Sequence, residues 1–141
     1  AMIYNPKLSL EGYDLDYSFA HELSHRIDSL EYHSWENDNF IRAIEICSGK
    51  VYAEEERIRE WFKPGGEYER SFAISDIVSA LSNAKISGMV GHSERYWSNP
   101  KLKAVEIFAN LNTIETLNLL EKKELNSIFD ELFKAYKEIV G

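Results

Sequence analysis

The spacing of apolar residues most constrains the fold of this chain, because it repeats at helical rather than strand intervals over most of the sequence. The clearest case is the stretch 121–139. Six apolar side chains fall there on one helical face: Leu125, Ile128, Phe129, Leu132, Phe133 and Tyr136. We expect this stretch to be a helix whose apolar face packs on a core. The pattern predicts a mainly α fold.

A first helix is predicted from a cap at Asp14 or Asp16 to about His33. Residues 1–10 contain Pro6 and are followed closely by Gly12, so we expect a loop or a short strand there. Apolar residues recur along the helix in steps of three and four: Phe19, Leu23, Ile27 and Leu30. This spacing makes the helix amphipathic.

Four more helices are predicted between these two. We expect them at about Asp38 to Gly49, Ala53 to Phe62, Ser71 or Ser75 to Leu81, and Pro100 to Ile114 or beyond. Lys63-Pro64-Gly65-Gly66 cannot continue a helix, whereas Pro100 suits a first helical turn. The stretch 86–91, with two glycines and branched residues, predicts a short strand or one arm of a β-hairpin, and 92–100 a loop or short turn. We expect one domain, 1–141, which could be a piece of a longer protein.

The charge balance argues against a nucleic-acid-binding protein. The net charge is -8, and binding to phosphates needs a basic surface. No apolar run approaches the roughly 20 residues of a membrane helix, and residues 1–10 lack the pattern of a signal peptide. The single cysteine, Cys47, excludes an internal disulfide framework and is expected to be a small buried hydrophobe. We expect a cytoplasmic protein that binds neither nucleic acid nor membrane.

One motif in the first predicted helix carries chemistry. The sequence His21-Glu22-Leu23-Ser24-His25 has the form HExxH. Residues i and i+4 lie one turn apart on the same helical face, so two imidazole nitrogens can reach one zinc ion at roughly 2.0–2.1 Å. Glu22 falls beside the first histidine, where it can act as a general base. The motif predicts a zinc site with ligands His21 and His25 and the catalytic residue Glu22.

A catalytic zinc site usually has three protein ligands and one open position, so a third ligand is needed. The metzincin pattern would require glycine at 28 and histidine at 31, but the chain has Asp28 and Glu31. Glu106 is the best candidate, because a carboxylate among apolar neighbours on a helix needs a partner such as a metal. Glu115 is a weaker alternative.

Other polar residues are expected around this site. Asn110 follows Glu106 by one helical turn and could accept a hydrogen bond from a ligand imidazole. Asp28, one turn beyond His25, either anchors a histidine or is structural. His33, two turns beyond His25, is expected to be a surface or core residue.

A peptidase also needs a donor that stabilises the oxyanion. The segment Gly91-His92-Ser93-Glu94-Arg95-Tyr96-Trp97 precedes the Glu106 helix and offers His92 and Tyr96. The alternative is that Tyr96 is a packing aromatic and that His92 caps a turn.

At this point the motifs resemble a known layout. HExxH followed by a distant glutamate on a second helix resembles the gluzincin zinc metallopeptidases. The order of HELSHRID (21–28), Tyr96 and Glu106-Ile107-Phe108-Ala109-Asn110 is similar to that of lethal-factor-type peptidases. It is still more similar to the C-terminal domain of prophage minor head (head morphogenesis) proteins, in which a GHSxxYW segment precedes an ExFAN-like helix.

The resemblance covers about 21–111 and implies a zincin-like helical domain in which the HExxH helix packs on the glutamate-bearing helix. It implies ligands His21, His25 and Glu106, base Glu22 and oxyanion donor Tyr96. The chain departs from the pattern in three ways: Ser24 stands where many relatives have glycine, Asn110 stands where lethal-factor-like enzymes carry an acid, and the spacing from Tyr96 to Glu106 is a few residues longer.

Two functions remain open from sequence. The first is a zinc-dependent peptidase that acts on a peptide or protein substrate, with Glu22 as base and Tyr96 or His92 as oxyanion donor. The second is a domain of a prophage head or assembly protein that interacts with phage structural proteins and uses the metal only for stability. In the second case we expect a fourth protein ligand, His92, to close the site.

Overall fold

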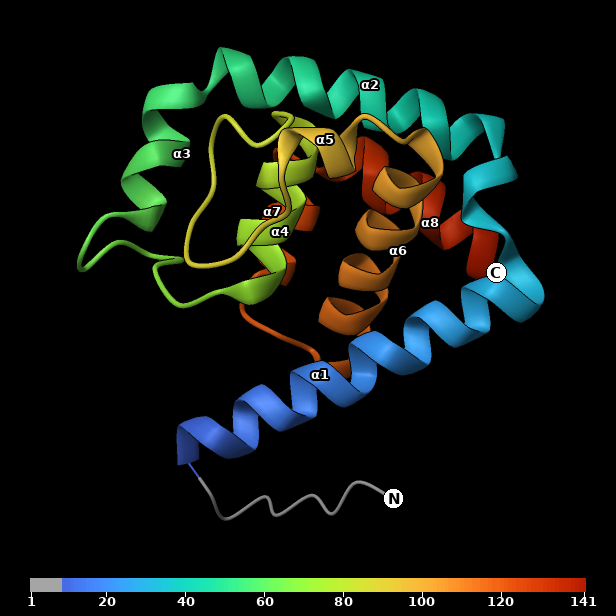
Figure 1. The fold of residues 1–141 in the computed structure, drawn as a ribbon, viewed down its shortest axis with the longest axis horizontal. Helices are drawn as coiled ribbons and strands as arrows, with labels where there is room; N and C mark the ends of the chain where they lie inside the picture. Colours follow the sequence, from blue (N-terminus) through green and yellow to red (C-terminus); the bar gives the residue numbers. More distant parts are fainter. Residues whose placement is uncertain (1–8) are drawn as a thin grey trace.

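The computed structural model describes residues 9–141, and these form a helical fold without strands (Figure 1). The elements in chain order are α1 (Ser9–Ile27), η1 (Asp28–Tyr32), η2 (Ser34–Glu36), α2 (Asp38–Ala53), α3 (Glu55–Phe62), α4 (Phe72–Leu81), α5 (Glu94–Trp97), α6 (Pro100–Leu117), α7 (Lys122–Leu125) and α8 (Asp130–Val140). The mainly α fold predicted from the apolar spacing is confirmed. None of the described helices combines the length and apolar character that crossing a membrane would require.

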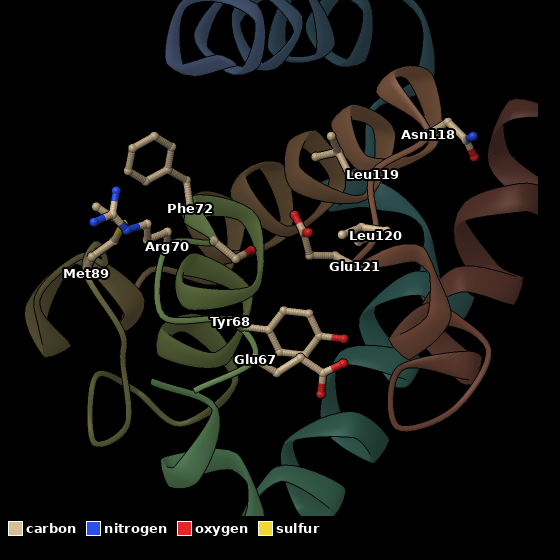
Figure 2. Close-up of a pocket in the computed structure, with 10 residues that line it drawn as sticks. Glu67, Tyr68, Arg70, Phe72, Met89, Asn118, Leu119, Leu120 and Glu121 are labelled. Atoms are coloured by element: carbon tan, nitrogen blue, oxygen red, sulfur yellow. The ribbon is translucent and has the colours of Figure 1, made fainter. Parts of the chain in front are cut away.

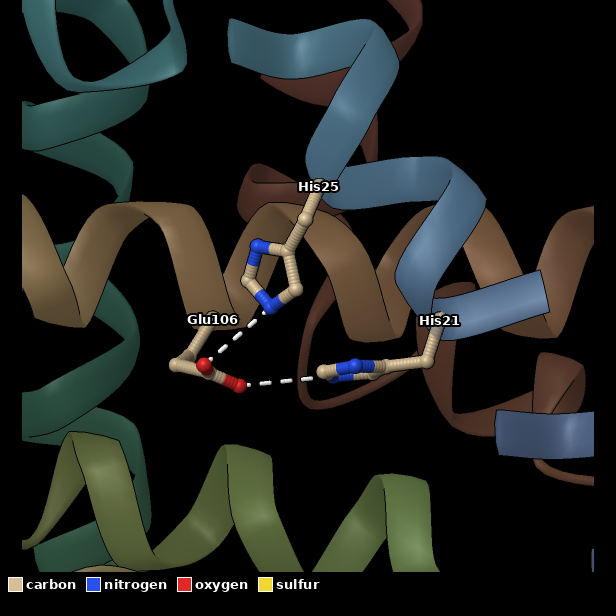
Figure 3. A group of neighbouring side chains, drawn as sticks. All are labelled: His21, His25 and Glu106. Atoms are coloured by element: carbon tan, nitrogen blue, oxygen red, sulfur yellow. Dashed lines mark ion pairs between the residues drawn. The ribbon is translucent and has the colours of Figure 1, made fainter. Parts of the chain in front are cut away.

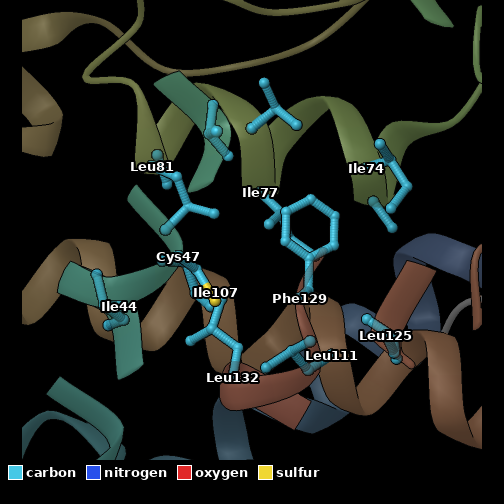
Figure 4. Close-up of a cluster of buried hydrophobic side chains, with 14 of the residues drawn as sticks. Ile44, Cys47, Ile74, Ile77, Leu81, Ile107, Leu111, Leu125, Phe129 and Leu132 are labelled. Atoms are coloured by element: carbon cyan, nitrogen blue, oxygen red, sulfur yellow. The ribbon is translucent and has the colours of Figure 1, made fainter. Parts of the chain in front are cut away.

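The core lies where α2, α4, α6 and α8 meet. In Figure 1, α1 (blue) and α2 (teal) lie on opposite sides of α4 and α6. Figure 4 shows side chains from the four core helices and from the segment around α7 pointing into one cluster. The following members are fully buried: Cys47, Ile74, Ile77, Leu81, Ile107, Leu111, Leu125, Phe129 and Leu132. At about 1.5–3 kcal/mol for each large apolar side chain, this cluster holds the four helices together.

Local capping explains why several helices begin where they do. The side chains of Asn37, Ser71 and Asn99 accept hydrogen bonds from backbone amides in the first turns of α2, α4 and α6, respectively. Such bonds satisfy N–H groups that have no partner inside the helix. Pro100 sits in the first turn of α6, where its missing N–H costs nothing. The predicted starts near Asp38, Ser71 and Pro100 are therefore confirmed.

Two of the predicted helices have the wrong extent. α2 continues through Gly49 to Ala53, because Val51 is fully buried and extends its apolar face. The stretch 121–139 is not one helix but two, α7 and α8, separated by a turn at 126–129. In that turn the backbone N–H of Phe129 donates to the Glu124 carbonyl (3.0 Å), which keeps both Leu125 and Phe129 in the core.

The start of the first helix also differs from the prediction. α1 begins at Ser9, so Asp14 and Asp16 both lie inside it and the predicted start is wrong. The predicted loop or strand over 1–10 falls, for residues 1–8, outside the described part of the chain. At its other end α1 passes into η1, and His33 then adopts a left-handed conformation (φ 51°) that redirects the chain toward α2.

The predicted strand or hairpin arm at 86–91 is wrong, because this stretch is a loop packed on α4. The Ser75 hydroxyl accepts hydrogen bonds from the backbone amides of Gly88 (2.8 Å) and Val90 (3.1 Å). The Ser75 hydroxyl thus pairs with backbone amides that a partner strand would otherwise pair with. Gly91 lets the loop backbone lie close to Ser79 of α4, because a Cβ added at Gly91 would lie 2.6 Å from the Ser79 hydroxyl.

Candidate metal centre

Two imidazoles of α1 and one carboxylate of α6 converge at the crossing of these helices (Figure 3). His21 Nε2 lies 3.3 Å from Glu106 Oε2, and His25 Nε2 lies 3.1 Å from Glu106 Oε1. One potential ligand atom from each residue lies within 4.8 Å of the others. The three residues predicted as ligands from sequence are therefore brought together.

The orientation of α1 is what presents the histidines to α6. Its buried side carries Tyr17, Ala20 and Ser24, and the buried Asp28 follows in η1. The Asn112 amide donates to the Ser24 hydroxyl (2.9 Å), and the Tyr17 hydroxyl donates to Asn110 Oδ1. These hydrogen bonds between α1 and α6 hold the mostly polar side of α1 inward. The apolar stripe of Phe19, Leu23, Ile27 and Leu30 is exposed.

The two imidazoles stabilise the negative charge of the Glu106 carboxylate. Burial alone would raise the pKa of Glu106, but hydrogen bonds from His21 and His25 hold it well below its usual range. Burial lowers the pKa of His25, yet its bond to Glu106 and nearby acidic groups together raise it above the ordinary value. The two imidazoles thus favour an ionised Glu106 although its side chain is buried.

Glu115 and His33, which the sequence left as lesser candidates, lie in other surroundings. The Glu115 carboxylate faces two lysine ammonium groups, at 3.3 Å from Lys122 and 3.6 Å from Lys137. His33 interacts with the Ser29 carbonyl (3.1 Å) and with Glu36 (3.7 Å). Glu106 is therefore the glutamate that faces the two histidines of the motif.

Asp28 secures the end of α1. Its two carboxylate oxygens accept hydrogen bonds from the Ser34 backbone amide (2.7 Å) and hydroxyl (2.5 Å). Burial raises the pKa of Asp28, and the bonds from Ser34 oppose that rise. The residue thus joins η1 to η2 just beyond His25.

Asn110 bonds to partners other than the imidazole expected from sequence. Its amide nitrogen donates to Asp76 Oδ2 (2.8 Å) and to the Glu106 carbonyl (3.0 Å), while its oxygen accepts from Tyr17. Both polar atoms of its side-chain amide are engaged, so Asn110 connects α1, α4 and α6 beside the three candidate ligands.

Asp76 is a residue of the site that the sequence prediction missed. It lies on α4, is buried, and its Oδ1 is 3.2 Å from His92 Nδ1. Burial raises the pKa of Asp76, and the Asn110 hydrogen bond opposes this. The signal was available, because Asp76 stands among apolar residues of a helix as Glu106 does.

His92 and Tyr96 both lie at this site, and their rings are stacked with centroids 3.9 Å apart. The Tyr96 hydroxyl donates to Glu106 Oε1 (3.2 Å). Burial and the neighbouring Glu106 raise the pKa of Tyr96, so its phenol keeps its proton. His92, Asp76 and Glu106 form a second group of possible ligands that shares Glu106, but His92 does not belong to the group of His21, His25 and Glu106.

Two hollows flank α1. One, of about 390 Å³, is lined by residues that include Tyr17, His21, Asp76, His92 and Glu106. The other, of about 380 Å³, is lined by Phe19, Glu22, Leu23, His25 and Arg26. Glu22 is exposed on α1 between the two histidines. The first hollow therefore lies beside the candidate ligands His21 and Glu106, whereas Glu22 borders the second.

Comparison with protein-family models, with curated proteins and with solved structures found no match to this chain. The resemblance to gluzincins therefore rests on the motifs and their order alone.

Proposed function

We propose that this chain is a zinc-dependent metallopeptidase-type domain. The observation that carries the proposal is the convergence of His21, His25 and Glu106 within 4.8 Å of one another. Two imidazoles and one carboxylate form the donor set of several catalytic zinc sites, and three protein ligands leave one position for water or substrate. A zinc ion held there would supply a Lewis acid that acidifies water and polarises a peptide carbonyl.

The residues around the centre have distinct roles in this proposal. Glu22 takes a proton from the attacking water and passes it to the leaving amine nitrogen. Tyr96 and His92 donate hydrogen bonds to the negative charge that develops on the oxygen of the peptide carbonyl. Asp76 is a positioning residue, since its carboxylate faces His92 Nδ1 and so leaves Nε2 for the substrate.

A second candidate is a non-catalytic domain of a prophage head or assembly protein, stabilised by zinc. The exposed apolar stripe on α1 favours it, because contiguous exposed apolar residues mark surfaces that contact partners. Either function would operate in the cytoplasm. A glutamate beside the first histidine favours the peptidase, because zinc binding alone does not need Glu22.

Metal content decides whether the centre exists. We expect about one zinc per chain by mass spectrometry of the purified protein, with a sharp loss in His21→Ala and in Glu106→Ala. His33→Ala is the matched control, because His33 follows the same helix but lies in other surroundings. Zinc that survives both ligand substitutions, or no zinc after reconstitution, would rule out this site.

Hydrolysis of a peptide library separates the two functions. We expect Glu22→Gln to keep its zinc and to lose activity by about 10²–10⁴-fold, since the general base is removed while the ligands stay. Glu31→Gln, which changes another exposed acid nine residues further on, serves as the control. Full activity in Glu22→Gln would disprove the mechanism, and inactivity of the zinc-loaded wild type on every peptide would favour the interaction domain.

A further inference from the structure

A separate hollow of about 510 Å³ lies between the start of α4 and the segment that follows α6. Figure 2 shows Glu121 in the middle of the residues that line it, with Phe72, Leu119 and Tyr68 around the carboxylate. Two large apolar side chains at the hollow are exposed to solvent, Met89 by 53% and Leu120 by 89%. The hollow is thus a mostly apolar surface with the Glu121 carboxylate at its middle, and its lining also includes the charged residues Glu67 and Arg70.

The Glu121 carboxylate lacks a partner for one of its oxygens. The residue is only 7% exposed, and its Oε2 accepts no hydrogen bond from the described residues. Ser71 and the residue's own backbone amide donate to the carboxylate, while burial raises its pKa. A buried acceptor without a donor costs free energy, so the folded chain is poised to take a donor at this point.

Of the nearby cationic residues, Arg70 also lines the hollow but forms no ion pair with Glu121, and two others are engaged elsewhere. Lys123 pairs with Glu67, and Arg57 lies 3.7 Å from the other buried glutamate of this region, Glu124. In the part of the chain that the structure describes, no lysine, arginine or histidine lies within ion-pair distance of Glu121. Glu121 Oε2 therefore lacks a donor among the described residues, and a cationic group of a partner could supply one.

We propose that this hollow binds a lysine side chain of a partner peptide, with the ammonium group on Glu121 Oε2 and the alkyl stem against Leu119 and Met89. A single free oxygen suits the point charge of an ammonium group better than the two-pronged guanidinium of arginine. The exposed Leu120 and Met89 suit apolar residues on either side of the lysine. The inference does not depend on the metal centre, although Phe72 lines both hollows and makes the sites neighbours.

Calorimetric titration with two short peptides tests the proposal. The probes are acetyl-Leu-Lys-Leu-amide and acetyl-Leu-norleucine-Leu-amide, which differ only in the ammonium group. We expect the wild type to bind the lysine peptide tighter by roughly tenfold or more, because a charge-assisted hydrogen bond is lost with norleucine. In Glu121→Gln the two affinities should agree within about twofold.

The matched control is Glu67→Gln, which removes a carboxylate from the same hollow but one that is exposed and paired with Lys123. It should keep the preference for lysine. An equal loss in both variants would mean general attraction to an acidic protein and would overturn the proposal. So would equal binding of both peptides by the wild type, or binding of n-butylammonium alone as tight as that of the peptide.

Folding of the test variant is checked by its thermal transition. Glutamine keeps the size of Glu121, so Glu121→Gln should unfold at the wild-type temperature or above it. Amide shifts in NMR spectra should locate the lysine peptide at Ser71, Met89 and Leu119. Shifts confined to the far side of the molecule would contradict the assigned site.

Discussion

Helices α1 and α8 are both amphipathic in sequence, yet they turn opposite sides to the protein. On α8 the apolar side is inside, and Leu132 is fully buried. On α1 the apolar stripe is outside, with Phe19 51% and Leu23 43% exposed. An apolar stripe on a surface helix ordinarily faces the core, so α1 is the exception that needs a cause.

The cause lies in what α6 offers to each neighbour. Toward α1 it presents Glu106, Asn110 and Asn112, and α1 supplies a polar partner for each. Turning α1 over would leave these polar groups of α6 without partners. Each unsatisfied polar group costs about 1–3 kcal/mol of stability, and a carboxylate costs more. That is comparable to the roughly 1.5–3 kcal/mol that burial of each large apolar side chain would return. An apolar stripe therefore predicts orientation only where the facing helix carries no buried polar groups.

The largest effect should separate the two helices directly. We expect Leu132→Ala to lower the free energy of unfolding by about 2–5 kcal/mol, because it leaves a cavity in the core. Leu23→Ala, the same change on the exposed stripe of α1, should alter it by less than about 0.5 kcal/mol. Urea denaturation measures both. Equal losses would break the comparison and mean that the stripe is covered in solution, which a dependence on protein concentration would reveal.

An intermediate effect should come from the polar contact between α1 and α6. Asn110→Ala removes the partner of both Tyr17 and Asp76, so we expect a loss of about 1–3 kcal/mol. Asn126→Ala, an exposed asparagine in the turn before α8, is the control and should cost little. If both variants unfold alike, hydrogen bonds do not set the orientation of α1.

The smallest effect should come from Glu121, a buried carboxylate with one oxygen that lacks a donor, and it should appear in the pH dependence of stability. Burial raises the pKa of Glu121 in the folded chain, so the stability it contributes is present below the unfolded pKa and is lost as pH rises through the folded one. Glu121→Gln has no such loss. Between pH 4 and pH 8 the free energy of unfolding of the variant should therefore rise relative to that of the wild type, by on the order of 1 kcal/mol. A difference that stays constant with pH would show that Glu121 is solvated.

Local signals explain what could be predicted from sequence. Caps such as Ser71 and Asn99-Pro100 act within a few residues, and the starts of α4 and α6 follow from them. The HExxH spacing acts within one helical turn, and the isolated acid Glu106 marked the facing helix. The same criterion applied to Asp76 would have found the residue opposite His92.

Long-range contacts explain what could not be predicted. The orientation of α1 depends on Asn110 and Asn112, which lie more than 80 residues further along the chain. The loop 86–91 depends on Ser75, whose hydroxyl replaces the strand that the glycines and branched residues suggested. In both cases the deciding partner comes from another helix and leaves no mark in the local pattern.

The single thiol of the chain allows opening of the core to be measured by chemical labelling. Cys47 is fully buried on α2, and burial raises the pKa of its thiol to about 11. Near pH 7.5 only roughly 10⁻³–10⁻⁴ of such a thiol is ionised, so a thiol reagent has almost nothing to attack while the helices stay packed. Modification of Cys47 therefore requires that the α2–α8 interface opens. At reagent concentrations at which labelling outpaces reclosing, the labelling rate gives the lifetime of the closed core, and at lower concentrations it gives the fraction of open molecules.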